Sequence, residues 1–347
     1  MLRFQPKLGA WSIAALLIMT LMLGACGDTT NTTAPTTVAA SAATTAATTT
    51  AATTAKTSSA ATTAPSGSKA GATVYPLTVT DDAKRSVKFE KMPSKIASLS
   101  PGTTELLYAL DLGDRVVGVD EYSDYPAEAK QKEKVGGYKE TNIERVVSLS
   151  TDLVLAAGIT SKQLISSLEA RGLTVLILNP SNLAGVLANI KLLAQVTNVP
   201  DKGNVVAADF QKKLDDVAAK IKGAKAQPRV FYELDPTLFT IAPGSFVDDM
   251  LQKAGGQNIV TDATNPYPQL NQEAVIAKDP EVILLGDDSA GTDTPEKIMA
   301  RPGWSNISAI KNKRVYVLEA SLVSRPGPRA ALGVENIAKT LYPDLFK

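Results

Sequence analysis

Residues 142–155 read NIERVVSLSTDLVL, and residues 271–284 read NQEAVIAKDPEVIL. Asparagine, glutamate and several apolar residues recur in the two stretches at a constant offset of 129 positions. In each stretch an asparagine suited to cap a helix comes first, and a short apolar run typical of a buried strand comes last. The recurrence predicts two similar folding units in one chain.

A second set of matches comes earlier in each half. At an offset of 142 positions, Pro101, Gly102 and Gly113 correspond to Pro243, Gly244 and Gly255. The order of the matches is the same both times, which favours two related halves over one sheet with an extension.

Short β-branched runs alternate with longer helical patterns, which predicts an α/β fold with mostly parallel sheets in two Rossmann-like lobes. The expected strands are residues 96–99, 116–119, 153–156, 175–178, 229–232, 282–285 and 315–318. Leu77 to Val79 and Ser86 to Phe89 are expected to form a β-hairpin against the first lobe.

One amphipathic helix is expected between the halves. Val206, Phe210, Leu214, Val217 and Ile221 step by four, four, three and four residues, which is the period of one apolar helical face. We therefore divide the body into a first lobe (73–200), a linker helix (201–223) and a second lobe (224–347). A single stiff helix would limit closure of the lobes to a small angle.

The first 72 residues differ from the rest. Arg3 and Lys7 precede an apolar run that ends in Leu23, Gly24, Ala25 and Cys26, which resembles a bacterial lipoprotein signal with Cys26 as the lipidated residue. Residues 29–70 contain 16 Thr and 14 Ala, a composition typical of a disordered tether. We expect a signal peptide (1–25), a lipidated cysteine with its tether (26–72), and an extracytoplasmic protein anchored to the membrane.

Composition excludes several functions. Without residues 1–25 the chain has 34 basic and 35 acidic side chains, and this balance gives no indication of nucleic-acid binding. The chain has no histidine, which excludes His-based catalytic triads and the common zinc-hydrolase ligand sets. We expect a monomer that is not an enzyme and holds no resident metal or cofactor.

Beyond these patterns, the chain from Tyr75 onward resembles the cobalamin and iron-siderophore binding proteins of ABC importers, and is closest to the cobalamin-binding branch. The stretches that carry the resemblance are KIASLSPGTTELLYALDL (95–112), VVGVDEYSDYP (116–126), NIERVVSLSTDLV (142–154), PYPQLNQE (266–273) and RPGWSNISAIKNKRVYV (301–317). The resemblance implies capture of a ligand in a cleft between the lobes and its delivery to a two-fold permease with a cytoplasmic ATPase.

Glu144 and Glu273 are the expected docking residues. Asn142 and Asn271 would place them in the first turns of two equivalent helices, where helix capping alone is the simpler role. The resemblance implies that one such glutamate on each lobe meets an arginine of each permease subunit.

The expected ligand contacts come from both lobes. Ser100, Gly102 and Thr103 follow a strand and open a helix, where ligands of open α/β sheets bind, although capping explains Thr103 equally well. Gly244 and Ser245 occupy the corresponding place in the second lobe.

The resemblance adds Tyr122, Tyr138 and Tyr267 as aromatic walls, and Arg325 and Arg329 as cations that could meet polar groups of the ligand. The sequence departs from the cobalamin branch in having tyrosine for tryptophan at 138 and 267, Ser321 at an acidic position, and no aromatic residue in 155–158.

Other interpretations remain open. A ferric siderophore or haem is the nearest alternative ligand, because tyrosinate can ligate ferric iron. A carboxylate-dependent surface hydrolase would use Glu233, Asp235, Asp287 and Asp288, but these residues have no motif spacing. Asp287, Asp288 and Asp293 also lack the spacing of a calcium loop. A purely structural surface lipoprotein is the third alternative.

Overall fold

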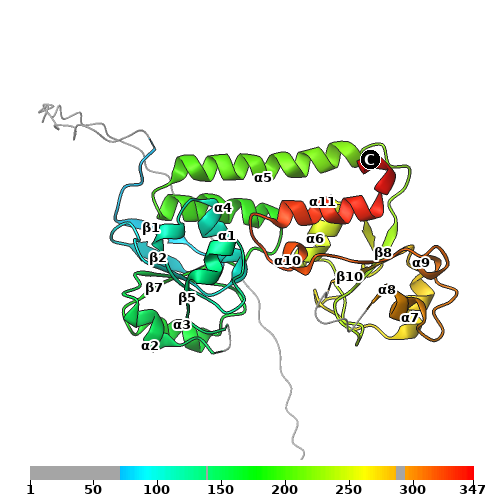
Figure 1. The fold of residues 1–347 in the computed structure, drawn as a ribbon, viewed down its shortest axis with the longest axis horizontal. Helices are drawn as coiled ribbons and strands as arrows, with labels where there is room; N and C mark the ends of the chain where they lie inside the picture. Colours follow the sequence, from blue (N-terminus) through cyan, green and yellow to red (C-terminus); the bar gives the residue numbers. More distant parts are fainter. Residues whose placement is uncertain (1–70, 138–139, 287–293) are drawn as a thin grey trace, which may run out of the picture. The chain divides into compact units, whose positions relative to one another are not determined.

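The computed structural model describes residues 71–137, 140–286 and 294–347, and these residues form a two-lobed α/β fold (Figure 1). The signal sequence, Cys26, the tether, Tyr138 and the residues 287–293 lie outside the described residues. No helix within the described ranges is long and apolar enough to cross a membrane.

The first lobe contains a five-stranded sheet in which every pair of neighbours is parallel. Its strands, in spatial order, are β5 (Glu133–Lys134), β4 (Val116–Val119), β3 (Ile96–Ser98), β6 (Leu153–Ala156) and β7 (Thr174–Ile177). Its helices are α1 (Pro101–Ala109), α2 (Ile143–Ser148), α3 (Lys162–Glu169) and α4 (Leu183–Val196).

The expected hairpin is confirmed. Strand β1 (Leu77–Thr80) pairs antiparallel with β2 (Ser86–Phe89), and the Asp82 amide donates to the Ile177 carbonyl at the end of β7. Phe89 and Val87 are buried in the core, so the alternate residues of β2 attach the hairpin to the first lobe.

The second lobe has a four-stranded parallel sheet. Its strands, in spatial order, are β11 (Val315–Val317), β10 (Val282–Leu285), β8 (Arg229–Glu233) and β9 (Gln257–Asn258). Its helices are α6 (Phe246–Lys253), α7 (Gln272–Lys278), α8 (Pro295–Met299), α9 (Ser308–Lys311), α10 (Ala320–Val323) and α11 (Ala330–Leu341).

Helix α5 (Pro200–Ile221) joins the lobes, and its 22 residues span roughly 33 Å. Figure 1 shows it beside α4 of the first lobe and α11 of the second, and close contacts connect it to both. Phe210 and Val217 are almost fully buried, and Val206, Leu214 and Ile221 pack against the same core. The predicted apolar face is confirmed, and the helix begins one residue and ends two residues before the expected bounds of 201–223.

One hydrophobic core extends through both lobes beneath α5. It includes Leu107 and Leu193 from the first lobe, Phe210 from α5, and Met250 and Val334 from the second lobe. Because close-packed cores deform little, this shared core opposes a large rotation of one lobe against the other.

The repeat at an offset of 129 residues is confirmed in three dimensions. Helix α2 leads into β6, helix α7 leads into β10, and each of these strands lies between two neighbours in its sheet. Val146 and Val275, which correspond in the repeat, are both fully buried.

The repeat at an offset of 142 residues is not matched in local structure. Gly102 lies within the first turn of α1, whereas Gly244 lies before α6 in a turn with φ of +92°. Gly102 and Gly244 therefore differ in their place relative to a helix, because α1 begins at Pro101 and α6 begins only at Phe246.

Candidate functional site

The carboxyl ends of the two parallel sheets are the first place to look for a ligand site. Asp124 follows the carboxyl end of β4 in the first lobe, and Arg325 follows β11 and α10 in the second. The Arg325 guanidinium lies 2.6 Å from the Asp124 carboxylate. The carboxyl edges of the two sheets therefore approach each other at this point.

A second connection between the lobes joins α4 and α6. The Leu183 amide, in the first turn of α4, donates to Asp249 in the first turn of α6 at 2.8 Å. Both helices follow strands of their sheets, so the lobes also meet on the carboxyl side here.

Exposed apolar side chains project from both carboxyl edges. In the first lobe, Tyr122 after β4 is 59% exposed and Ile159 after β6 is 64% exposed. In the second lobe, Tyr267 is 43% exposed and Phe239 is 39% exposed. These four side chains are the candidate contacts for a ligand that touches the carboxyl edges of both sheets.

Main-chain pairing positions Tyr267. The Thr240 amide donates to the Pro268 carbonyl and the Ala242 amide to the Pro266 carbonyl, each at 2.9 Å. This pairing lays the segment around Tyr267 against the chain that returns from β8. Burial, and secondly the nearby Tyr267 phenol, raise the pKa of Tyr232, whose ring is buried below.

Sequence reasoning missed Ile159 and Phe239. Ile159 is a lone large apolar residue in the loop after β6, and that position is the signal that could have found it. Phe239 directly follows Leu238, so the sequence does not single it out. Tyr138 lies outside the described residues, but a Cβ on its neighbour Gly137 would lie 3.5 Å from the Tyr122 ring. The segment that leads to Tyr138 therefore lies beside Tyr122.

The turn after β4 is held by a buried carboxylate. Asp120, only 1% exposed, accepts hydrogen bonds from the Tyr122 amide at 2.7 Å and the Ser123 hydroxyl at 3.2 Å. Burial raises the pKa of Asp120 above its usual range, while these hydrogen bonds lower it. The Lys134 ammonium donates to the carbonyls of Asp120 and Ser123, which fixes the turn that presents Tyr122.

Thr103 is engaged inside the protein. Its hydroxyl lies 2.7 Å from the Ser98 hydroxyl and 2.8 Å from the Ser100 hydroxyl, and the residue is only 5% exposed. The structure thus gives Thr103 a packing role. The N-cap residue of α1 is Ser100, which is partly exposed and makes no side-chain capping hydrogen bond.

The three small residues expected at the ligand have different surroundings. A Cβ on Gly102 would lie 3.0 Å from the Pro326 carbonyl oxygen, so Gly102 contacts the second lobe directly. Gly244 is exposed and faces open space. The Ser245 hydroxyl caps α6 by accepting from the Asp248 amide at 3.2 Å, and Ser245 is 2% exposed.

Arg325 and Arg329 are paired with carboxylates of the first lobe. The Arg329 guanidinium makes two hydrogen bonds to Glu105, at 2.9 and 2.6 Å, and its centre lies 4.0 Å from the centroid of the Tyr125 ring. Arg325 lies between Glu105, at 3.2 Å, and Asp124, at 2.6 Å. The hydrogen bond from Arg325 lowers the pKa of Asp124, so this carboxylate stays charged.

Glu144 and Glu273 occupy equivalent exposed positions. The Asn142 side chain accepts from the Arg145 amide and the Asn271 side chain accepts from the Ala274 amide, both at 2.8 Å. Both predicted N-caps are therefore confirmed, and each glutamate lies in the first turn of its helix. Glu144 also forms an exposed ion pair with Arg171 at 3.2 Å.

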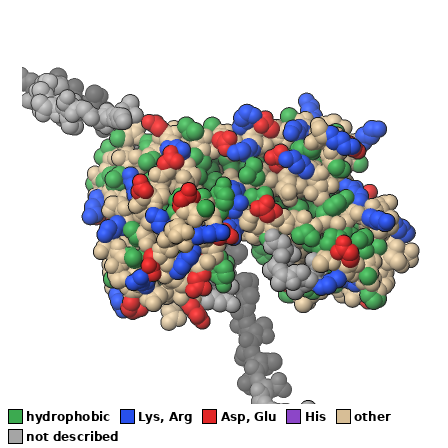
Figure 2. All heavy atoms as spheres, in the orientation of Figure 1, with side chains coloured by type: hydrophobic (Ala, Val, Ile, Leu, Met, Phe, Trp, Pro, Cys, Tyr) green, Lys and Arg blue, Asp and Glu red, His purple; other side chains and the backbone are tan. Residues whose placement is uncertain are grey.

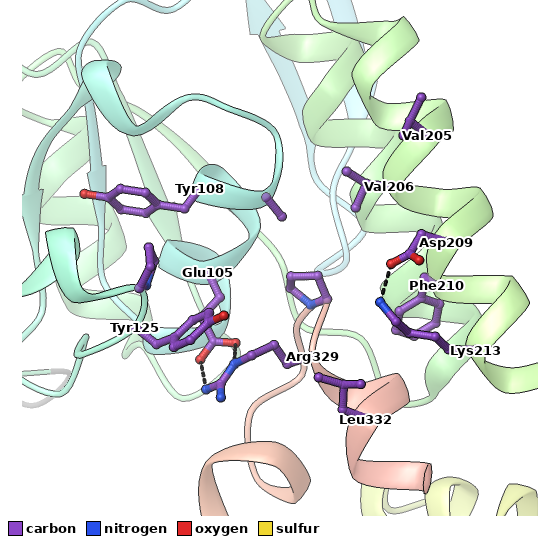
Figure 3. Close-up of a pocket in the computed structure, with 13 residues that line it drawn as sticks. Glu105, Tyr108, Tyr125, Val205, Val206, Asp209, Phe210, Lys213, Arg329 and Leu332 are labelled. Carbon is purple, nitrogen blue, oxygen red and sulfur yellow. Dashed lines mark hydrogen bonds and ion pairs between the residues drawn. The ribbon is translucent and has the colours of Figure 1, made fainter. Parts of the chain in front are cut away.

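A pocket of about 460 Å³ lies behind the paired arginines, between α1, α5 and the start of α11. On one side of the pocket, Figure 3 shows Arg329 hydrogen-bonded to Glu105 near the Tyr125 ring. On the other side it shows the Asp209 and Lys213 pair of α5. Among the described residues that we expected to contact the ligand, Arg329 alone lines this pocket.

The two described carboxylates of the hydrolase alternative, Glu233 and Asp235, form hydrogen bonds within the protein. Glu233 is 1% exposed and receives two hydrogen bonds from Arg301, at 2.9 and 2.7 Å. Asp235 accepts from the amide and hydroxyl of Thr237. Asp287 and Asp288 lie outside the described residues, and the described part of the chain holds no cluster of three potential metal ligands.

Charges of both signs are interspersed on the face of the molecule that Figure 2 shows. This distribution agrees with the balanced composition and differs from the basic stripe of a nucleic-acid-binding surface.

Comparison with known proteins supports a common origin with solute-binding proteins. Residues 96–322 match the family model described as periplasmic binding protein. An uncharacterized ABC transporter substrate-binding lipoprotein of Bacillus subtilis (strain 168) is 32% identical, with 99% of each chain covered.

Two solved structures extend the similarity to ligand-binding relatives. The periplasmic vitamin B12-binding protein of Vibrio cholerae is 31% identical with a TM-score of 0.63, covering 72% of this chain and 97% of its own. A periplasmic haem-binding protein in complex with two haems is 28% identical with a TM-score of 0.67, covering 74% of this chain and 100% of its own.

Proposed function

This chain belongs to the periplasmic binding protein family, and we propose that it captures cobalamin or a related corrinoid for an ABC importer. The observation that carries the proposal is the presence of exposed tyrosines, Tyr122 and Tyr267, at the carboxyl edges of two different lobes. A flat ligand held between them would be buried on both faces. The similarity to the vitamin B12-binding protein of Vibrio cholerae supports a corrinoid as that ligand.

The physical basis is burial of apolar surface on a rigid frame. Each aromatic side chain buries roughly 150 to 250 Å² of surface in such contacts. The shared core and helix α5 keep the two edges in place, so little binding free energy is spent on ordering the site. Ile159 and Phe239 add apolar surface, one from each lobe.

A ferric chelate or haem is the second candidate ligand. The observation in its favour is that the exposed phenols of Tyr122 and Tyr267 could ligate ferric iron. The pairing of Arg325 and Arg329 with Glu105 and Asp124 weakens this candidate, because it leaves less positive charge for an anionic chelate.

We extend the proposal to anchoring and partners. Cys26 would carry the lipid anchor on the outer face of the membrane, and the following tether would let the monomeric body reach a permease dimer with its ATPase. Glu144 and Glu273 would dock on that dimer, because one carboxylate on each lobe matches a two-fold partner and can accept bidentate hydrogen bonds from arginine. In this role the protein carries out no chemistry on its ligand.

Titration with four compounds tests the ligand. Cyanocobalamin, cobinamide, haemin and a ferric siderophore are added to the purified protein, and binding is followed by ligand absorbance. Trp304 is fully buried beside Phe231, so its emission is a poor reporter for the carboxyl edges. Binding of the corrinoids supports the proposal, binding of haemin or the siderophore alone supports the second candidate, and binding of none of the four contradicts both.

Two tyrosine variants locate the site. Replacing Tyr122 or Tyr267 with Ala should weaken corrinoid binding by about 1 to 3 kcal/mol, because each removes one aromatic wall. This corresponds to about a 5- to 150-fold rise in Kd. Val205→Ala is the matched control, since Val205 is 63% exposed but lies on α5 away from both edges. Unchanged titration curves for both tyrosine variants would place the ligand elsewhere.

A further inference from the structure

We infer that Arg325 and Arg329 are lobe-positioning residues, which join the second lobe to Glu105, Asp124 and Tyr125 of the first. We call these five residues the interlobe cluster. The inference rests on the proposed function only where it predicts an effect on ligand binding. It gives the two arginines a role in fixing the separation of the lobes in place of a direct contact with the ligand.

The hydrogen bonds of the cluster cross from lobe to lobe. The Glu105 side chain on α1 is 1% exposed and receives hydrogen bonds from both guanidinium groups, at 2.6 and 2.9 Å from Arg329 and 3.2 Å from Arg325. The two arginine side chains are only 18% and 14% exposed. A carboxylate buried this deeply depends on its cationic partners, so separating the lobes would leave a charge uncompensated.

Main-chain atoms meet at the same place. A Cβ on Gly102 would lie 3.0 Å from the Pro326 carbonyl oxygen, and a Cβ on Gly327 would lie 3.1 Å from the Gly102 carbonyl oxygen. Two glycines, one from each lobe, therefore permit a backbone-to-backbone approach next to the arginines. This contact holds the Arg325 to Arg329 loop against the start of α1.

One short turn connects the cluster to the proposed ligand wall. Tyr122 is at one end of the turn after β4, and Asp124 and Tyr125 are at the other. Asp120 accepts from the Tyr122 amide, and Lys134 donates to two carbonyls of the turn, so the turn is braced from within. A shift of the interlobe cluster would therefore move Tyr122.

The second lobe contains a closely matched control. Glu233 and Arg301 also form a two-bond pair, with side chains 1% and 14% exposed, and these values equal those of Glu105 and Arg329. Both partners of this control pair belong to the second lobe. The pair of Glu105 and Arg329 thus connects the lobes, whereas the pair of Glu233 and Arg301 lies within one lobe.

The test measures the separation of the lobes directly. Ser166 on α3 and Lys311 on α9 are exposed, and Cys26 is the only cysteine of the chain. The full chain carrying Cys26→Ser, Ser166→Cys and Lys311→Cys is purified in detergent and spin-labelled, and the distance distribution is recorded by pulsed electron resonance without any ligand.

Glu105→Gln should broaden the distance distribution and shift it to a different mean, whereas Glu233→Gln should leave it as in the parent protein. Arg329→Lys keeps the charge but loses the paired hydrogen bonds, and should give an intermediate width. Circular dichroism confirms that each variant is folded. A folded Glu105→Gln protein with the parent distribution would overturn the inference, as would equal broadening by Glu233→Gln.

A second readout relates the cluster to binding. With cyanocobalamin as the probe, Glu105→Gln should raise Kd at least tenfold, and the loss should accompany the broadened distances. If the parent protein does not bind cyanocobalamin, the proposed ligand fails, while the distance measurement without ligand still decides the role of the cluster. If it binds and Glu105→Gln changes distances but not Kd, the link from the cluster to the ligand wall is wrong.

Discussion

Residues 142–156 of the first lobe and 271–285 of the second form the same unit, in which a capped short helix leads into a central strand. Residues 101–113 and 243–255 match in sequence but differ in structure, since Gly102 packs against the other lobe and Gly244 is exposed. The shared unit is the one that presents a glutamate on each lobe. The two lobes are thus alike at the residues that a two-fold partner would contact. They differ at the residues through which the lobes contact each other.

The largest expected effect comes from the shared glutamates. If both lobes dock on a permease dimer, Glu144→Ala combined with Glu273→Ala should abolish uptake of labelled cyanocobalamin by cells that express the importer. Either single change should cause a partial loss of similar size, because the two contacts are equivalent. The cyanocobalamin Kd of the double variant should equal that of the parent protein, since both side chains are exposed and lie outside the proposed ligand wall.

The result separates docking from capping. Asn142 and Asn271 supply the helix caps, so removing the glutamates leaves the capping hydrogen bonds in place. Normal uptake by the double variant would show that the glutamates are not docking residues. A large change in Kd would instead place them in the ligand site.

A smaller effect is expected from the buried valines of the shared unit. Val146→Ala and Val275→Ala should each lower the free energy of unfolding by about 1.5 to 3 kcal/mol, because both side chains are fully buried. The two losses should agree within about 0.5 kcal/mol when measured by chemical denaturation, and Val205→Ala should change stability by less than that amount. A difference above about 1 kcal/mol would show that the units are alike in backbone but not in packing.

The strands and the linker helix could be predicted because their signals are local. Val116–Val119, Leu153–Ala156 and Val282–Leu285 form strands with the expected bounds, since each is a short apolar run between turn residues. Strand β7 begins one residue earlier than expected, at Thr174. The apolar face of α5 follows from its spacing alone.

The interlobe cluster could not be predicted, because its contacts join residues far apart in the chain. Arg325 lies 220 positions from Glu105 and 201 from Asp124, and no local pattern pairs them. The arginine-rich loop was visible in the sequence, but its partners were not. The sequence therefore indicated two positively charged side chains. It left open whether their partner would be a ligand or the other lobe.

The smallest expected effect concerns a local difference between Glu144 and Glu273, the two glutamates proposed to dock. Glu144 pairs with Arg171 at 3.2 Å, whereas no lysine or arginine of the described ranges lies within ion-pair distance of Glu273. Because both members of the pair are more than half exposed, Arg171→Ala should change the free energy of unfolding by less than about 0.5 kcal/mol. The same change frees Glu144 for a permease arginine, so half-maximal uptake should need slightly less protein, by about twofold or less.

Lys162→Ala, on an exposed residue of α3, is the control for loss of one positive charge on the first lobe. Weaker uptake by the Arg171 variant alone would mean that Arg171 itself contacts the permease, and the two lobes would then dock through unequal surfaces.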